Sequence, residues 1–199
     1  MNNFAIDLNL EIDYILKNEN FFSTLNFTKV NKPNHVQVNV NECKDQFLDW
    51  VTDLGLFIKH LEIFYTNPYG NIFIHVDDID PIDSCKINYV YDCGNTTMNW
   101  YRIKNNASLK VKNNNIGSTY LSCDNETDYI LAYKHVIKKG TLVNVAIPHG
   151  VQNNSKYPRY CISVTFQCKN NPKRIGFNEM LQLVNPWIIP NEGNFLSHL

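Results

Sequence analysis

Alternation of apolar and polar residues is the main structural signal in this chain, and it predicts many short strands. In residues 35–40, Val36, Val38 and Val40 alternate with polar neighbours, as in a strand with one buried face. Similar patterns predict further strands over 56–65, 71–76, 85–91, 99–103, 119–122, 130–135, 141–147 and 159–167. Turn residues separate them, as in the Asn-Pro-Tyr-Gly segment at 67–70.

Helical spacing is clear in one place, where apolar residues recur over 42–54 at Phe47, Leu48, Val51 and Leu54. Asn41 is the expected cap of this helix, and Gly55 ends it. A second, shorter helix is predicted over 177–184. Eight or so short strands with few helices predict an all-β core, a sandwich or barrel, with flanking helices. No linker divides the chain, so we expect one domain over residues 1–199.

Composition narrows the function classes. Hydrophobic residues make up 44% and charged residues 19%, which is typical of a globular protein. The net charge of −1 and the lack of a broad basic face make binding to duplex nucleic acid unlikely. No apolar stretch is long enough to cross a membrane.

None of the six cysteines forms a CxxC pair, and the first residues do not resemble a signal peptide. We therefore expect reduced thiols in a cytoplasmic protein, and the abundance of Asn, Lys and Ile favours an AT-rich source such as a virus or bacterium.

Candidate chemistry lies at the ends of three predicted strands. His75 and Asp77 end the apolar segment NIFIHVD, where residues two apart point to one face. His149 follows the apolar segment TLVNVAIP, and Arg159 opens RYCISVTF ten residues later. If His149 ends one strand and Arg159 begins the next, we expect a hairpin that places the two residues on adjacent strands. Two histidines and one carboxylate can occupy one face of an octahedral metal and leave three positions open, as in non-haem iron(II) oxygenases. An arginine is suited to hold the far carboxylate of a 2-oxo acid through two hydrogen bonds.

The order of these motifs, HxD, a distant His and then Arg, resembles the iron(II)/2-oxoglutarate oxygenase superfamily. The segment PHGVQNNSKYPRYCISVTF is similar to the last part of that motif in phytanoyl-type, aspartyl/asparaginyl-hydroxylase-like and phage-encoded members. The resemblance covers about residues 71–166, and it implies a double-stranded β-helix, or jelly roll, with an N-terminal helix outside. It also implies His75, Asp77 and His149 as Fe(II) ligands and Arg159 as the contact for 2-oxoglutarate. The reaction implied is hydroxylation of an unidentified substrate with dioxygen.

One position departs from the family pattern, in which many members have Arg-x-Ser. Cys161 takes the place of that serine, and Ser163 on the same strand face is the candidate to assist. A second contact to 2-oxoglutarate is expected in KINYVYD, from Asn88, Tyr89 or Tyr91, with Asn88 favoured.

Two other functions fit the same pattern: a non-catalytic jelly-roll binding module, and a cupin-type metalloenzyme, which would not need Arg159. Other features have a functional and an ordinary interpretation. The acidic run 77–83 is a rim for a cationic substrate or a solvated loop, and Met98 to Tyr101 form an aromatic wall or part of the core. The remaining histidines are expected to lie outside the site: His35, His60, His135 and His198.

Overall fold

A computed structural model gives the fold of this chain. It describes residues 4–10, 15–18, 22, 35–77, 84–91, 94–113, 119–137, 140–169 and 174–190. The acidic run beyond Asp77, together with Cys93 and His198, lies outside these residues.

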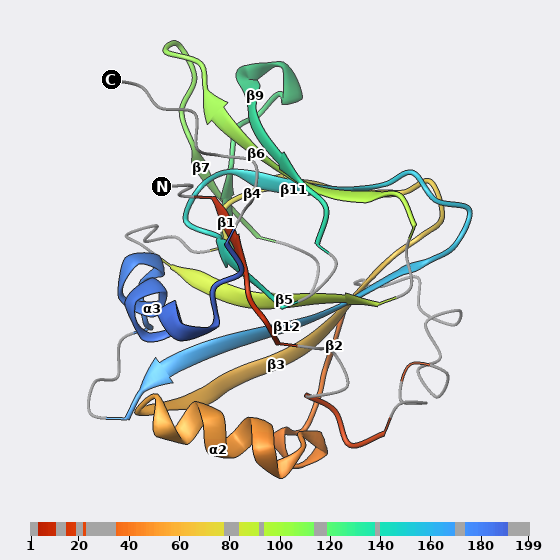
Figure 1. Cartoon of the computed structure of the whole chain (residues 1–199). Helices are drawn as coiled ribbons and strands as arrows, with labels where there is room; N and C mark the ends of the chain where they lie inside the picture. Colours follow the sequence, from red (N-terminus) through yellow and green to blue (C-terminus); the bar gives the residue numbers. More distant parts are fainter. Residues whose placement is uncertain are drawn as a thin grey trace.

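Two antiparallel sheets face each other (Figure 1). The large sheet has the order β1 (Ala5–Asp7), β10 (Thr141–Asn144), β5 (Cys85–Tyr91), β12 (Arg159–Cys168), β3 (Leu56–Thr66) and β2 (His35–Gln37). The small sheet has the order β4 (Asn71–His75), β11 (His149–Asn153), β6 (Thr96–Ile103) and β9 (Tyr129–His135). A separate hairpin is formed by β7 (Lys110–Asn113) and β8 (Thr119–Ser122).

The path of the chain between the sheets identifies the architecture. Strands β3, β5, β10 and β12 belong to the large sheet, while β4, β6, β9 and β11 belong to the small one. The chain crosses between sheets at each step except from β6 to β9, and all neighbouring strands pair antiparallel. This is a double-stranded β-helix with additional edge strands, as the sequence predicted.

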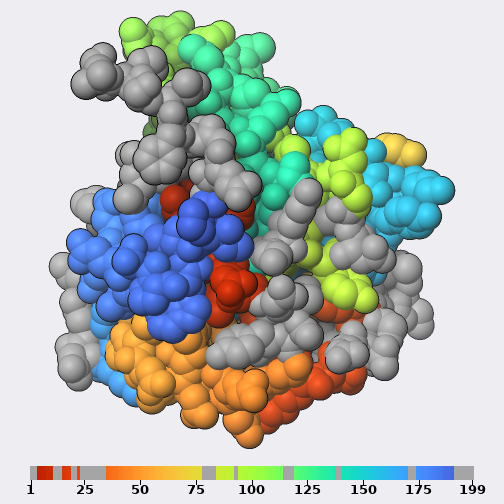
Figure 2. Space-filling view, in the orientation of Figure 1, coloured from red at the N-terminus to blue at the C-terminus, as the bar shows by residue number. Residues whose placement is uncertain are grey.

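The main apolar core lies on the outer face of the large sheet. There, buried side chains such as Ile87 and Ile162 pack with Phe47 and Trp50 of helix α2 (Asp45–Asp53) and Met180 of helix α3 (Phe177–Leu183). Figure 2 shows these two helical segments side by side on the surface of the molecule. Burial of this face accounts for most of the apolar area that stabilises the fold.

The inner face of the large sheet is much more polar. Because side chains alternate along a strand, the neighbours of the buried apolar residues in β5 and β12 point toward the small sheet. They include Lys86, Asn88, Arg159 and Ser163, and the last three are 7% exposed or less. Buried polar groups are costly unless they have partners, so this lining indicates a binding site between the sheets.

Several predicted elements differ in detail. The strand predicted over 35–40 ends at Gln37, where a 3-10 turn (Val40–Glu42) follows, and helix α2 begins at Asp45, so Asn41 does not cap it. Gly55 does end it, with a left-handed φ of 72° that favours glycine. Three further strands were not predicted from the sequence, namely β1, β7 and β11. The structure also includes two short 3-10 helices, Glu126–Asp128 and Asn185–Trp187.

The relation expected between His149 and Arg159 is wrong. A hairpin placing them on adjacent strands was expected, but His149 begins β11 in the small sheet and Arg159 begins β12 in the large one. Residues 154–158 cross from one sheet to the other. The two side chains therefore belong to opposite walls of the sandwich.

Candidate metal centre

Three potential metal ligands meet at one edge of the small sheet. His75 ends β4, Asp77 follows it by two residues, and His149 begins the neighbouring strand β11 and pairs with His75. Their nearest ligand atoms all lie within 4.8 Å of one another. Nε2 of His75 is 3.0 Å and Nε2 of His149 is 3.4 Å from Oδ1 of Asp77. Three ligands on one face of a metal, each at about 2.1 Å, would lie about 3 Å apart, so the set fits a metal ion.

A bulge in β4 places the imidazole of His75 beside the imidazole of His149. Between His149 and Val151 the pairing with β4 shifts, so that two steps along β11 match three steps along β4, from His75 to Ile72. Gly150 makes this possible, because a Cβ at that position would lie 2.9 Å from the carbonyl oxygen of Ile72. The glycine that follows His149 therefore helps to position His75.

Backbone carbonyls set the orientation of both rings. Nδ1 of His75 lies 2.9 Å from the oxygen of Phe73, and Nδ1 of His149 lies 2.9 Å from the oxygen of Ile147. Since a carbonyl only accepts, each Nδ1 donates, and Nε2 of a neutral ring then carries a lone pair. Both lone pairs point toward Oδ1 of Asp77, which is an acceptor as well. Three acceptors facing one point need a cation between them, either a proton on an imidazole or a metal ion.

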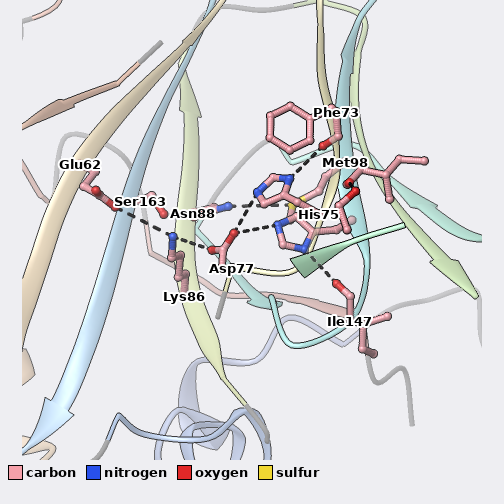
Figure 3. A network of polar contacts seen from close by, with 12 residues as sticks. Glu62, Phe73, His75, Asp77, Lys86, Asn88, Met98, Ile147 and Ser163 are labelled. Atoms are coloured by element: carbon pink, nitrogen blue, oxygen red, sulfur yellow. Dashed lines mark hydrogen bonds and ion pairs between the residues drawn. The ribbon is translucent and has the colours of Figure 1, made fainter. Parts of the chain in front are cut away.

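Lys86 completes the charge balance on the other side of Asp77 (Figure 3). Its Nζ lies 2.7 Å from Oδ2 of Asp77 and 3.9 Å from Oε2 of Glu62. The two oxygens of Asp77 thus have different partners, Oδ1 the imidazoles and Oδ2 the ammonium. Because Lys86 pairs with Oδ2, Oδ1 of Asp77 remains available to bind a metal as a single ligand atom.

These contacts shift the pKa values of the site. Burial raises the pKa of Asp77, but the charge of Lys86 and the imidazole hydrogen bonds outweigh burial and hold it well below its usual range. Burial lowers the pKa of Lys86, yet the charges of Asp77 and Glu62 leave it above its usual value. Burial also lowers the pKa of both imidazoles. For His75 the hydrogen bond to Asp77 outweighs burial and the pKa is raised, whereas for His149 burial prevails and the pKa is lowered.

Of the residues predicted to contact 2-oxoglutarate, Arg159, Ser163 and Asn88 lie on the inner face of the large sheet. Ser163 and Asn88 pair across β12 and β5, and the Ser163 hydroxyl donates to Oδ1 of Asn88 at 2.7 Å. Within the described residues, the one contact of the Asn88 amide nitrogen is the sulfur of Met98, at 3.9 Å, so the amide retains donor capacity. Tyr89 and Tyr91, the alternatives to Asn88, lie on the opposite face of the strand, and Tyr89 belongs to the outer core. Cys161, at the departure from the family pattern, is buried on the inner face.

Arg159 is buried on this same inner face, at 2% exposure. Among the residues that the structure describes, its Nε has no hydrogen-bond partner and its guanidinium forms no ion pair with a carboxylate. Burying an arginine in this way is costly, and an anionic ligand would offset the cost.

A pocket of about 180 Å³ lies beside β4, lined by residues that include two neighbours of His75. Phe73 and Tyr120 contribute to its wall, and both rings contact the imidazole of His75, at centroid distances of 5.1 Å and 6.2 Å. Of the two interpretations of the segment from Met98 to Tyr101, core packing holds for Met98 and Trp100. Trp100 is fully buried there, and its Nε1 donates to the oxygen of Asn144.

The histidines expected to be ordinary do not join the metal ligands among the described residues. His35 lies 3.9 Å from Glu62, and His135 lies 2.8 Å from Asp7. The five described cysteines are free thiols. No described helix has the length and apolar character of a membrane span.

No protein-family model and no curated protein sequence matches the chain. Solved structures that show a partial similarity to the chain include the non-heme monooxygenase ThoJ in complex with Ni, at 14% identity and a TM-score of 0.36 over 67% of this chain and 53% of that one. An uncharacterized protein with a double-stranded beta-helix domain from Klebsiella pneumoniae is 14% identical, with a TM-score of 0.30 over 59% of this chain and 72% of that one. An oxidoreductase of the 2OG-Fe(II) oxygenase family from Burkholderia pseudomallei is 12% identical, with a TM-score of 0.34 over 66% and 55%. The chain spans little more than half of this oxidoreductase and of ThoJ. The double-stranded β-helix is shown by the strand order of the chain itself.

Proposed function

We propose that this protein is a non-haem iron(II)- and 2-oxoglutarate-dependent oxygenase. The observation that supports it best is the convergence of Nε2 of His75, Nε2 of His149 and Oδ1 of Asp77 on one point. These three groups bind the metal and leave its remaining positions open, as oxygenase chemistry requires. A structural zinc site normally has four protein ligands, and the described residues supply three to this cluster.

Each residue has a task in this proposal. The carbonyls of Phe73 and Ile147 keep both Nε2 atoms available, and Lys86 holds Oδ2 of Asp77 so that Oδ1 alone faces the metal. Bound iron(II) and 2-oxoglutarate supply the oxidising chemistry, in which dioxygen oxidises a substrate C–H bond and succinate and carbon dioxide leave.

Arg159 favours the 2-oxoglutarate reaction over a cupin-type alternative. A cupin-type site does not need this side chain, yet the guanidinium is buried on the wall that faces the small sheet, with an unpartnered Nε among the described residues. In the proposal it holds the distal carboxylate of 2-oxoglutarate. Asn88, whose amide still has donor capacity, and Ser163, which orients it, assist from the same wall.

Anaerobic titration of iron(II) and 2-oxoglutarate into the purified protein tests this function. We expect the weak visible charge-transfer band of the ternary complex. The band should vanish in His75→Ala and weaken in Arg159→Ala. Bound metal without a band would contradict 2-oxoglutarate dependence, and Arg159→Ala with unchanged activity would favour the cupin-type enzyme. Bound metal and no 2-oxoglutarate consumption with any substrate would favour the binding module.

A further inference from the structure

Two neighbouring strands of the large sheet carry buried polar atoms that have no hydrogen-bond partner in the described part of the chain. Thr66 ends β3, Arg159 begins β12, and the two residues are register partners. Cross-strand partners point to the same face, with Cβ atoms about 5 Å apart. Arg159 is on the face of Ser163 and Asn88, so Thr66 also points between the sheets.

The unpartnered atoms of this pair are complementary to one kind of ligand. Oγ1 of Thr66 and Nε of Arg159 are both buried and have no hydrogen-bond partner among the described residues. Thr66 is 1% and Arg159 2% exposed. Nε can only donate, and the hydroxyl can donate as well. A group with two adjacent acceptor oxygens and a negative charge satisfies both, which describes a carboxylate.

The end of β3 is held in place for such a role. The side-chain amide of Asn153 donates to the carbonyl of Asn67 at 2.9 Å and to that of Tyr157 at 2.8 Å, with a longer contact of 3.4 Å to the carbonyl of Thr66. These contacts join the strand that ends at Thr66 to the segment that leads into Arg159. The backbone of both residues is thereby fixed, while Oγ1 of Thr66 and Nε of Arg159 have no hydrogen-bond partner among the described residues.

We propose that Thr66 and Arg159 together bind the distal carboxylate of 2-oxoglutarate, with the threonine hydroxyl as the second contact. The inference rests on the proposed function and adds a binding residue to it. It also gives Ser163 and Asn88 a role that differs from that of Thr66. The Ser163 hydroxyl is already donated to Asn88, whereas the Thr66 hydroxyl has no such partner among the described residues.

Calorimetric titration of the anaerobic iron(II)-loaded protein with three acids tests the pair. 2-Oxoglutarate carries both ends, glutarate only the distal carboxylate, and pyruvate only the 2-oxo acid. Thr66→Val keeps the shape but removes the hydroxyl, and it should weaken 2-oxoglutarate and glutarate roughly 10-fold while leaving pyruvate unchanged. Thr66→Ser should bind nearly as the native protein does. Thr97→Val is the matched control, because Oγ1 of Thr97 is also buried and unpartnered among the described residues. Thr97 differs in direction: its strand neighbour Met98 packs in the core, so Thr97 points away from the interior.

The outcomes separate this inference from the function on which it rests. Equal affinity of Thr66→Val and native protein for 2-oxoglutarate overturns the role of Thr66 and leaves the oxygenase proposal standing. Glutarate binding that depends on Thr66, without 2-oxoglutarate binding at the metal, supports the carboxylate site and removes the oxygenase proposal. If neither dicarboxylate binds the native protein, both proposals fall.

Discussion

At the scale of single residues, Lys86 is the group that sequence reasoning missed. Its neighbours in KINYVYD drew attention as co-substrate contacts, while the lysine resembled an ordinary surface residue of a strand. A signal was present, because Lys86 and Asn88 alternate with apolar Ile87 and Tyr89 in a strand next to the HxD motif. A polar face on a strand of the large sheet indicates the lining of a functional site. This signal can be used only when it is known that the strand belongs to that sheet.

Removing the Lys86 ammonium should affect the metal-free protein most. In Lys86→Met the buried Asp77 carboxylate loses its closest cation, with Glu62 nearby as a like charge. Breaking a buried ion pair costs about 3–5 kcal/mol of unfolding free energy. A bound divalent metal would compensate the carboxylate, so the loss should be smaller with the metal. Urea unfolding with and without Mn(II) measures both values. Lys110→Met, at an exposed pair with Asp124, is the control and should change neither. Equal losses in both states for Lys86→Met would contradict this account.

The raised pKa of His75 predicts how metal binding depends on pH. A protonated His75 stabilises the metal-free protein below the ordinary histidine pKa of about 6.5, and this contribution disappears as pH rises through the raised folded pKa. A metal needs the deprotonated ring, so apparent affinity should increase with pH over the same window. Asp77 stays ionised throughout, because its pKa is held well below the usual value. The thermal shift caused by Mn(II) should therefore grow between about pH 5.5 and 8. A shift independent of pH would show that His75 carries no proton in the metal-free protein.

At the scale of elements, apolar alternation located most strands, including 85–91 and 119–122 with the bounds that the structure has. It failed for β11, because the sequence HGVQN has one large apolar residue and no alternation. Its place in the sheet comes from pairing with β4 and β6 on both sides, which is a tertiary effect. The error about His149 and Arg159 follows directly, since a missed strand hides a crossing between sheets.

Gly150 offers a test of the bulge that positions His75. In Gly150→Ala the new Cβ would meet the Ile72 carbonyl oxygen at 2.9 Å, and backbone must move to relieve the contact. We expect a loss of about 1–3 kcal/mol in stability, as for other overpacked sites. Metal affinity should fall roughly 10-fold or more, because β4 carries His75. Calorimetric metal titration measures the second effect. Gly94→Ala is the matched control, since a Cβ there has no neighbour within 4 Å. Native metal affinity in Gly150→Ala would show that the bulge does not set the ligand geometry.

At the scale of the whole molecule, the two faces of the large sheet have different roles. Its outer face packs against α2 and α3, and its inner face carries the polar groups around the candidate site. Strand count and resemblance were enough to predict the double-stranded β-helix. They did not predict which residues of a strand face inward, because in a sandwich covered by helices both faces are buried and hydrophobicity alone does not distinguish them.

Substitutions at two adjacent residues of β12 can test the different roles of the two faces. Ile162 is fully buried in the outer core, and Ile162→Ala should cost about 2–5 kcal/mol in unfolding free energy. Ser163 points inward, and Ser163→Ala removes one hydrogen bond to Asn88, with an expected loss of about 1 kcal/mol. Affinity for 2-oxoglutarate should show the opposite order. At temperatures where both variants are folded, Ile162→Ala should bind like the native protein, while Ser163→Ala should bind more weakly because the Asn88 amide is no longer oriented. Weaker binding by a fully folded Ile162→Ala would mean that the outer core also sets the geometry of the inner wall.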